Sequence, residues 1–579
     1  METDQSPKRR SLVDRLFGYI DNRLPSDRLI INVLLISCVI LGVITLLTLN
    51  KSNTVTVPTS GGTLIEGVIG APRFVNPVLA ITKADHDLVA LLYSGLMRLG
   101  NSGQLENNLA ESVTLSEDGR VYNIVIKNNL VFHDNSPLTA DDVAFTIALV
   151  QDPELKSPLR GNWTGVEVEV LGEHEINLVL EDAYTPFLEN LTMGILPKHI
   201  WSELATEELP FSQYNTEPIG TGPYRVGDIK RSLSGLVDEY QLTVVETENS
   251  PNIESIVMRF YQNEAEILTA LEEQEITSSA ALSYEILPTL DTEELQIIEE
   301  PLPRVFSLYF NQNKSPVVRD EGVRKALSTV VNRDDLVEFT LNGFGTPTAS
   351  PIPVGFRKVQ SDDQEDSETE ENPDKLATAK EILIDAGWTQ TEAGTWEKEI
   401  DETNTELTIT IRTANAPVFE ATTEYLKSVW EPLGVTVGVE LFEQNDLVQA
   451  VIRPRDYEAL LFGADIGRSM DYYPFWHSSQ REDPGLNVAL YTNITTDKIL
   501  EDLRTTTSED EKEALLDKFV SEIVSEQPAI FLFNPSFIYV LTKNINHLPM
   551  SRLSRPSERF SNIKDWHMSE SKVWPLFAN

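Results

Sequence analysis

The chemistry-bearing part of this sequence runs from Leu461 to Gln480. It combines five aromatic rings with four ionisable side chains: Phe462, Tyr472, Tyr473, Phe475, Trp476, Asp465, Arg468, Asp471 and His477. A core strand carries few charges and a plain surface loop carries few rings. Rings beside fixed charges are typical of a pocket for an amphipathic ligand. The alternative is a packed loop whose aromatic rings cover the core.

The elements that must position this stretch indicate a mixed α/β protein. Alternating apolar residues predict strands at Val121–Lys127, Val166–Val170, Leu407–Arg412 and Val435–Leu441. Apolar residues at helical spacing predict helices at Thr139–Val150, Gly322–Val331 and Asp374–Ala386. Thr139 and Asp142 fit a capping box at the start of the first helix, and Gly387 ends the last.

Length and charge restrict the class of protein. A chain of 579 residues exceeds a single core and should form two to four domains. It carries 46 basic and 91 acidic residues, and this surface repels phosphate, which excludes nucleic acid as a partner. The negative charge suits a cationic partner or a salty medium. Cys38 is the single cysteine, so an intramolecular disulfide is excluded.

The N-terminal region predicts a membrane anchor. Residues 1–28 lean basic, with a surface helix expected at Ser11–Asn22, and Leu29–Leu49 is an uncharged apolar run. As a helix rising ~1.5 Å per residue, this run spans a hydrocarbon core of about 30 Å. The arginines before it place the N-terminus in the cytoplasm and the large domain outside the cell. A signal peptide would be shorter, and a lipoprotein cleaved at Cys38 would continue with polar residues, so we predict an uncleaved span.

Two further segments are expected to lie outside the folded core. Residues 50–62 are polar, contain Pro58 and a glycine pair, and predict a linker. Residues 358–374 form an acidic, low-complexity insertion, which predicts a solvated loop.

The sequence lacks the motifs of common enzymes and metal sites. A Walker loop, a G-x-S-x-G elbow and an H-E-x-x-H helix are all absent. The seven histidines are scattered without metal-ligand spacing, and no acidic pair stands out as a glycosidase dyad. We therefore predict a binding protein that is not an enzyme and that uses no cofactor or metal.

An ordered series of short motifs resembles the extracellular solute-binding proteins, family 5, of ABC importers for oligopeptides, dipeptides and nickel. The series covers about residues 62–550: Phe74–Pro77, Leu92–Leu96, Leu109–Ser112, Ser116–Gly119, Val131–Val143, Gly220–Tyr224, Val323–Leu327 and Ala386–Trp388. Gly220–Tyr224 reads G-T-G-P-Y, as in the family. Asn135 stands where glycine is usual, and asparagine also tolerates a left-handed turn.

This resemblance implies a periplasmic-binding-protein-like clamshell of class II, with two α/β lobes and an extra subdomain, preceded by one transmembrane helix. On this chain the first lobe would comprise residues 63–92, 183–303 and 526–579. The subdomain would comprise residues 93–182 and the second lobe residues 304–525.

The resemblance also implies the ligand contacts. Asp465 stands where the family has the carboxylate that binds a peptide's N-terminal ammonium through a charge-assisted hydrogen bond. Ala71–Phe74 match the segment whose main chain pairs with the ligand as an added strand. The predicted contacts are Asp465, Phe462, Gly463, Trp476, Tyr472, Ala71, Arg73 and Phe74. The alternatives are that Asp465 pairs with Arg468, that Trp476 belongs to the core, and that Arg73 is merely solvated.

The implied function is the capture of oligopeptides between the lobes of a monomer, followed by hinge closure and delivery to ABC transporter permease subunits. One alternative keeps the fold and changes the solute to a metal chelate, haem or sugar. Others are a peptide sensor and an anchored extracellular hydrolase.

Overall fold

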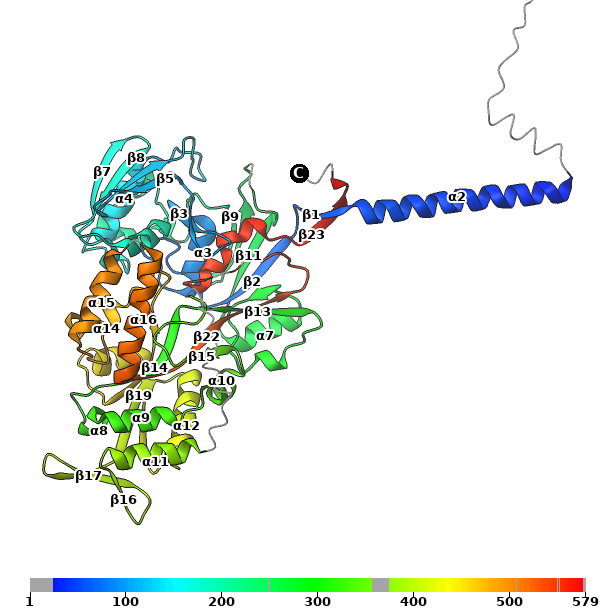
Figure 1. Ribbon diagram of the computed structural model, residues 1–579. Helices are drawn as coiled ribbons and strands as arrows, with labels where there is room; N and C mark the ends of the chain where they lie inside the picture. The colour runs from blue at the N-terminus through cyan, green and yellow to red at the C-terminus, as the bar shows by residue number, and fades with distance from the viewer. Residues whose placement is uncertain are drawn as a thin grey trace, which may run out of the picture. The chain divides into compact units, whose positions relative to one another are not determined.

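The structure, a computed structural model, describes residues 24–247, 250–356, 374–506, 508–548, 550 and 552–575. They fall into two units, one that ends at Ser60 and resumes at His567, and one from Gly61 to Trp566 (Figure 1). The predicted helix Ser11–Asn22 lies outside the described residues, as does the acidic insertion except for Asp374.

The smaller unit pairs segments from near the two ends of the chain. Its elements are α2 (Pro25–Asn53), β1 (Val55–Thr59) and β23 (Ser569–Val573). β1 and β23 form an antiparallel ladder with Val55 opposite Val573. The predicted linker, residues 50–62, therefore contains the end of a helix and a strand.

The helix α2 covers the apolar run Leu29–Leu49 that the sequence predicts to cross a membrane. In the part of the chain that the structure describes, no helix has both the length and the apolarity needed to span a bilayer. The prediction of a transmembrane anchor at residues 29–49 is therefore not supported.

The larger unit is built on one 12-stranded sheet. Its strands are β2 (Thr63–Ile69), β9 (Tyr224–Arg231), β10 (Val237–Val244), β11 (Ser255–Tyr261), β12 (Ser278–Ser279), β13 (Leu295–Pro301), β14 (Arg304–Phe310), β15 (Gly345–Pro347), β19 (Thr408–Ala414), β20 (Thr436–Phe442), β21 (Ala459–Asp465) and β22 (Ala529–Thr542). Their order is β20-β19-β21-β14-β22-β12-β2-β11-β10-β9, and β13 and β15 also pair with β22.

The strand β22 connects two halves of this sheet. Its first residues pair with β14, and its last residues pair with β12 and β13. All of its residues except the last are buried. We call β14, β15 and β19–β21 the β14 half and β2 and β9–β13 the β2 half. Only Leu302 and Pro303 separate β13, in the β2 half, from β14, in the β14 half. The chain therefore passes between the halves at two places, along β22 and from β13 to β14.

The β14 half is covered on both faces. Its helices are α8 (Pro316–Arg319), α9 (Glu321–Thr329), α10 (Arg333–Leu341), α11 (Lys375–Asp385), α12 (Pro417–Trp430), α13 (Gln444–Asp446), η5 (Leu447–Ile452), α14 (Tyr473–Trp476), η6 (Ser478–Gln480), α15 (Ile494–Thr505) and α16 (Glu509–Glu526), and a hairpin sheet holds β16 (Thr389–Gln390), β17 (Trp396–Ile400) and β18 (Thr403–Glu406). Figure 1 shows α9, α11 and α12 near β19, and α14–α16 as a separate group. Side chains alternate along a strand, so successive residues of β14 belong to different hydrophobic cores. Leu308 lies in the core that contains Trp430, and Tyr309 lies in the core that contains Trp476.

A buried ion cluster joins three elements of the β2 half. This half adds α3 (Lys83–Leu92), α7 (Glu264–Glu272), η4 (Leu287–Thr289) and η7 (Pro556–Asp565). Arg559 of η7 lies 2.8 Å from Glu66 of β2 and 2.7 Å from Asp87 of α3, and all three are buried. Burial raises the pKa of Glu66 and the Arg559 charge opposes that shift. Because a buried charge is tolerated only when paired, the cluster fixes β2, α3 and η7 against one another.

The subdomain region is a four-stranded sheet, ordered β5-β6-β8-β7, with a small hairpin and short helices. Its elements are β3 (Met97–Leu99), β4 (Leu105–Asn107), β5 (Ala110–Leu115), β6 (Val121–Ile126), α4 (Ala140–Gln151), α5 (Arg160–Trp163), β7 (Glu167–Gly172) and β8 (Glu175–Val179), followed by η1 (Thr185–Thr192), α6 (Lys198–Trp201), η2 (Thr206–Phe211) and η3 (Gln213–Asn215). The predicted capping box is confirmed, since the Thr139 N–H donates to Asp142 at 2.8 Å.

The G-T-G-P-Y motif packs against the end of α3. A Cβ on Gly220 would collide with the carbonyl oxygen of Leu92, and one on Gly222 with that of Leu91. Both glycines are therefore required by a close backbone approach.

Candidate ligand-binding site

Asp465 lies at the open end of β21. The strand begins with the buried residues Ala459–Leu461 and ends with this carboxylate, whose side chain is 45% exposed. In the antiparallel ladder with β14, Asp465 stands opposite Arg304, and the Arg304 Nη2 lies 2.9 Å from its Oδ2. The predicted alternative partner, Arg468, pairs elsewhere. Asp465 is thus held by strand register while one side of its carboxylate faces solvent.

Gly463 makes room for a ring rather than leaving open space. A Cβ at this position would lie 2.9 Å from the ring of Phe306, which stands opposite in the ladder. Phe306 in turn stacks on Phe533 of β22 at 5.2 Å. Phe462, its neighbour on β21, is half-buried and packs partly against the core beneath α14–α16. The end of β21 is therefore rigid on its inner side.

Tyr472 and Trp476 lie inside the core. They are 1% and 2% exposed, so they line no open surface here. Tyr472 packs on Phe519 of α16 at 4.9 Å, and Trp476 packs on Phe531 of β22 at 5.9 Å. Both are predicted ligand contacts, and the structure places them beneath the strand end, as in the alternative in which the rings cover the core.

Asp471 ties the β14 half to the subdomain region, a role that the sequence did not reveal. It accepts hydrogen bonds from Arg504 at 2.6 Å and from the Tyr184 hydroxyl at 3.0 Å. The Arg504 guanidinium also lies 3.9 Å from the ring centroid of Tyr473. Burial, followed by the Asp471 charge, raises the pKa of Tyr184, so its hydroxyl stays protonated and keeps donating.

A second tie joins Arg468 to Glu558 of the segment η7 at 2.6 Å. Glu189 of η1 lies close to this pair. Burial raises the pKa of Glu189 to about 7, although the charge of Arg468 opposes that shift. Two separate polar contacts thereby hold the loop 466–471 after β21, one with Tyr184 just before η1 and one with Glu558 of η7.

The turn at Ala71–Phe74 is organised by Asp85. This fully buried carboxylate accepts hydrogen bonds from the backbone N–H groups of Arg73 at 2.7 Å and Phe74 at 2.8 Å, and also from Ile81 and Thr82. Two of the amides expected to face a ligand are therefore occupied. The Ala71 N–H and the carbonyls of residues 71–74 make no hydrogen bond with other described residues. Arg73 is exposed, with its guanidinium 5.0 Å from the ring centroid of Phe74.

The sequence signal for Asp85 was available but ambiguous. Thr82 and Asp85 form a capping box at the start of α3, which a Thr-x-x-Asp pattern indicates. The additional bonds to the turn twelve residues earlier follow only from the folded chain. Among the described residues, no group of three His, Cys, Asp or Glu side chains is placed to hold a metal ion.

Comparison with known proteins agrees with this architecture. Residues 104–483 match the family described as bacterial extracellular solute-binding proteins, family 5 Middle. The oligopeptide-binding protein AppA of Bacillus subtilis (strain 168) is 24% identical over 520 residues, which cover 89% of this chain and 93% of AppA.

Solved structures share the fold. The structure of Bacillus subtilis AppA in complex with a nonapeptide has a TM-score of 0.67 and 24% identity, covering 89% of this chain and 100% of that one. NikZ from Campylobacter jejuni in complex with Ni(L-His) has a TM-score of 0.66 and 22% identity, covering 87% and 99%. These likenesses show the two-lobed α/β fold that the sequence predicts. The chain belongs to the bacterial extracellular solute-binding proteins of family 5.

Proposed function

We propose that this protein is the substrate-binding component of an ABC importer and that it captures oligopeptides outside the cell for a permease. The observation that carries the proposal is the half-exposed carboxylate of Asp465, fixed at the end of a buried strand. Such a group can bind an ammonium by a charge-assisted hydrogen bond, stronger than one between neutral groups. The name of AppA and its nonapeptide complex support the same solute class.

The peptide main chain would pair with the turn at Ala71–Phe74. Its carbonyls are open acceptors, whereas the amides of Arg73 and Phe74 donate to Asp85. A bound peptide would therefore donate its N–H groups to this turn more than it accepts from it. Binding through main-chain atoms reads few side chains, so a broad range of peptide sequences is expected.

Hinge closure would involve the crossing strands β13–β14 and β22. The pairs Asp471–Tyr184 and Arg468–Glu558 lie beyond this crossing and would be made or broken as the halves move. A ligand stabilises the closed form only to the extent that it binds that form more tightly. We infer a monomer, because Asp465 and the turn at Ala71–Phe74, the two sides of the proposed site, both belong to one chain.

A second candidate solute class is suggested by Arg304. A cation and a carboxylate side by side at the strand end also suit a zwitterionic small molecule, and NikZ was solved with Ni(L-His). Mass spectrometry of the solute that co-purifies with the protein separates the two classes. A mixture of peptides of different masses supports oligopeptide capture. A single small zwitterion supports the second solute class.

Calorimetric titration with mixtures of tri- to nonapeptides tests the proposal. Saturable heat is expected with free-amine peptides, and none with a mixture of single amino acids. A folded protein that gives no heat with any peptide would contradict peptide capture.

A further inference from the structure

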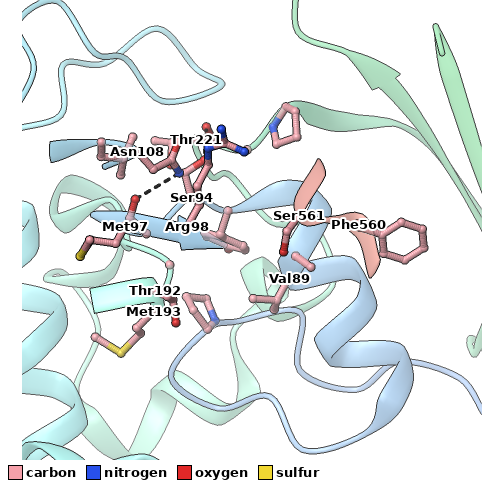
Figure 2. Close-up of a pocket in the computed structure, with 18 of the residues that line it drawn as sticks. Val89, Ser94, Met97, Arg98, Asn108, Thr192, Met193, Thr221, Phe560 and Ser561 are labelled. Carbon is pink, nitrogen blue, oxygen red and sulfur yellow. Dashed lines mark hydrogen bonds between the residues drawn. The ribbon is translucent and has the colours of Figure 1, made fainter. Parts of the chain in front are cut away.

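A cavity in the larger unit lies apart from the predicted ligand contacts. It has a volume of about 840 Å³ and is lined by α3, β3, the ends of η1 and β4, the G-T-G-P-Y segment and η7. Figure 2 shows Val89 of α3, Arg98 of β3, Met193 after η1 and Phe560 of η7 around it. None of the eight predicted ligand contacts is among its lining residues. Its size falls in the range of roughly 300–1,000 Å³ that is usual for small-molecule sites.

The charge of the described lining is opposite to that of the whole protein. The chain has 46 basic and 91 acidic residues. The cavity lining has six basic residues against two acidic ones, Glu189 and Glu558. The basic residues are Arg98, Lys127, Arg225, Arg468, Arg555 and Lys564. A chain this acidic concentrates cations by chance only rarely, so the reversal points to a local requirement for positive charge.

Half of these cations already have a partner. Arg98 pairs with Glu106 at 2.9 Å, Arg468 pairs with Glu558 at 2.6 Å, and Lys127 donates to the Asn108 carbonyl at 2.5 Å. The remaining three, Arg225, Arg555 and Lys564, make no ion pair with any described residue. They come from β9, from the residue before η7 and from η7 itself, so segments far apart in the sequence bring their unbalanced charge to one cavity.

Two histidines of the lining lie near these arginines, and near carboxylates whose charges act in the opposite direction on the histidine pKa values. Burial lowers the pKa of His86, and the charge of Arg555 lowers it further. Burial likewise lowers the pKa of His133, with Arg225 acting in the same direction. Both lowered pKa values favour the neutral ring, so the histidines add no charge to that of the cations. Arg225 and Arg555 are exposed and Lys564 is partly buried, and the charge of Arg555 also acts to lower the pKa of Glu189.

We propose that this cavity binds a small anion with two or more negative charges, of the phosphate or polycarboxylate class, independently of the solute at Asp465. Arg225 and Arg555 offer planar donor forks that match oxyanions, and Lys564 adds a point charge. Apolar side chains, among them Val89, Met97 and Phe560, line the rest and suit a compact organic anion. Because the lining joins the β2 half to the subdomain region, the bound anion would hold the two together.

Pyrophosphate and citrate serve as probes of the two anion classes. Thermal unfolding and calorimetric titration of the full chain are recorded with each probe at matched ionic strength, and with chloride as the reference. Saturable binding and a concentration-dependent rise in Tm are expected with at least one of the two. The probe that binds more tightly identifies the class.

The double variant R225Q/R555Q should bind that probe at least tenfold more weakly. K498Q/K518Q is the matched control, since it removes two exposed positive charges on α15 and α16 and should bind as the unchanged protein does. If R225Q/R555Q folds poorly, K564Q provides the same comparison. Peptide titration should be unaffected in all of these variants.

Two results would overturn the proposal. One is the absence of saturable binding for both probes. The other is equal binding by R225Q/R555Q and K498Q/K518Q, which would assign any effect to the general charge of the chain. If the protein without pyrophosphate or citrate fails to bind peptides, that result contradicts the proposed peptide site at Asp465 and leaves the anion proposal for this cavity unaffected.

Discussion

The guanidinium of Arg304 lies 2.9 Å from the carboxylate of Asp465, at the last rung of the β14–β21 ladder. The two side chains are 36% and 45% exposed, so their attraction is screened by water and is worth about 0.2–1 kcal/mol. Arg304 also begins the strand that follows the crossing at Leu302 and Pro303. Arg304, which under the proposed function would compete with a ligand ammonium for Asp465, therefore stands where the two halves of the sheet meet.

Replacing Arg304 by glutamine should strengthen the binding of free-amine peptides by about two- to fivefold, because the ammonium no longer competes with the guanidinium. Calorimetric titration measures the change. K314Q is the matched control, since Lys314 pairs with Asp456 at 2.7 Å with similar exposure. Weaker binding by R304Q would mean that Arg304 itself contacts the ligand.

Replacing Asp465 by alanine should weaken the binding of free-amine peptides by about 10- to 100-fold, the loss expected for a hydrogen bond to a charged group. N-acetylated forms of the same peptides should lose far less. The variant D465A/R304Q corrects for the arginine left unpaired, through a double-mutant cycle. Equal losses for both kinds of peptide would remove Asp465 from the ammonium site.

Stability should depend on pH through Glu189, whose pKa burial raises to about 7. A carboxyl whose pKa is higher in the folded than in the unfolded protein stabilises the fold fully below about pH 4.5, its unfolded value. That contribution is lost as pH rises through 7. The free energy of unfolding should therefore fall from pH 5 to pH 8 by on the order of 2–3 kcal/mol more in the unchanged protein than in E189Q.

Urea unfolding at several pH values measures this difference. E111Q, at an exposed position, is the control and should keep the pH dependence of the unchanged protein. Identical pH profiles for E189Q and the unchanged protein would show that Glu189 ionises as freely in the fold as in water.

Replacing Asp85 by asparagine should lower the free energy of unfolding by on the order of 3 kcal/mol, because a buried carboxylate that accepts four backbone N–H bonds is replaced by a group with donors of its own. Peptide affinity should fall as well, because Asp85 positions the turn at Ala71–Phe74 without touching the ligand.

Urea unfolding and peptide titration are compared for D85N and D141N. Asp141 is 62% exposed, and Lys198 is its one ion-pair partner among the described residues, so its substitution should change neither quantity by more than about 0.5 kcal/mol. A less stable D85N with unchanged peptide affinity would place the ligand away from this turn.

Local patterns predicted most of the regular elements that could be checked. The strand predicted at Val121–Lys127 is β6 (Val121–Ile126), and the helix predicted at Asp374–Ala386 is α11 (Lys375–Asp385), capped by Asp374. Alternation, helical spacing and caps act within a few residues, so the sequence displays them directly. The helix α2 likewise covers residues 29–49, but the described helices include none suited to cross a bilayer, so the predicted membrane span is not supported.

Because sequence patterns reflect only neighbouring residues, they did not predict the burial and the long-range contacts at the site. An aromatic ring beside a charge has the same signature in a pocket wall and in a core, so Tyr472 and Trp476 could be placed only by their 1% and 2% exposure in the fold. The Asp471–Tyr184 bond and the Arg468–Glu558 pair join residues 287 and 90 positions apart, and no spacing rule reaches so far.

By itself the sequence determined the mixed α/β class and the motif series of a solute-binding family, and that resemblance singled out the carboxylate of Asp465. Only the tertiary structure decided that Arg304 faces that carboxylate and that Asp85 occupies two amides of the turn at Ala71–Phe74. It also decided that three cations with no ion pair to a described residue line one cavity. The physical reason is that composition and periodicity are properties of neighbouring residues. Strand register and the meeting of distant segments depend instead on how the whole chain packs.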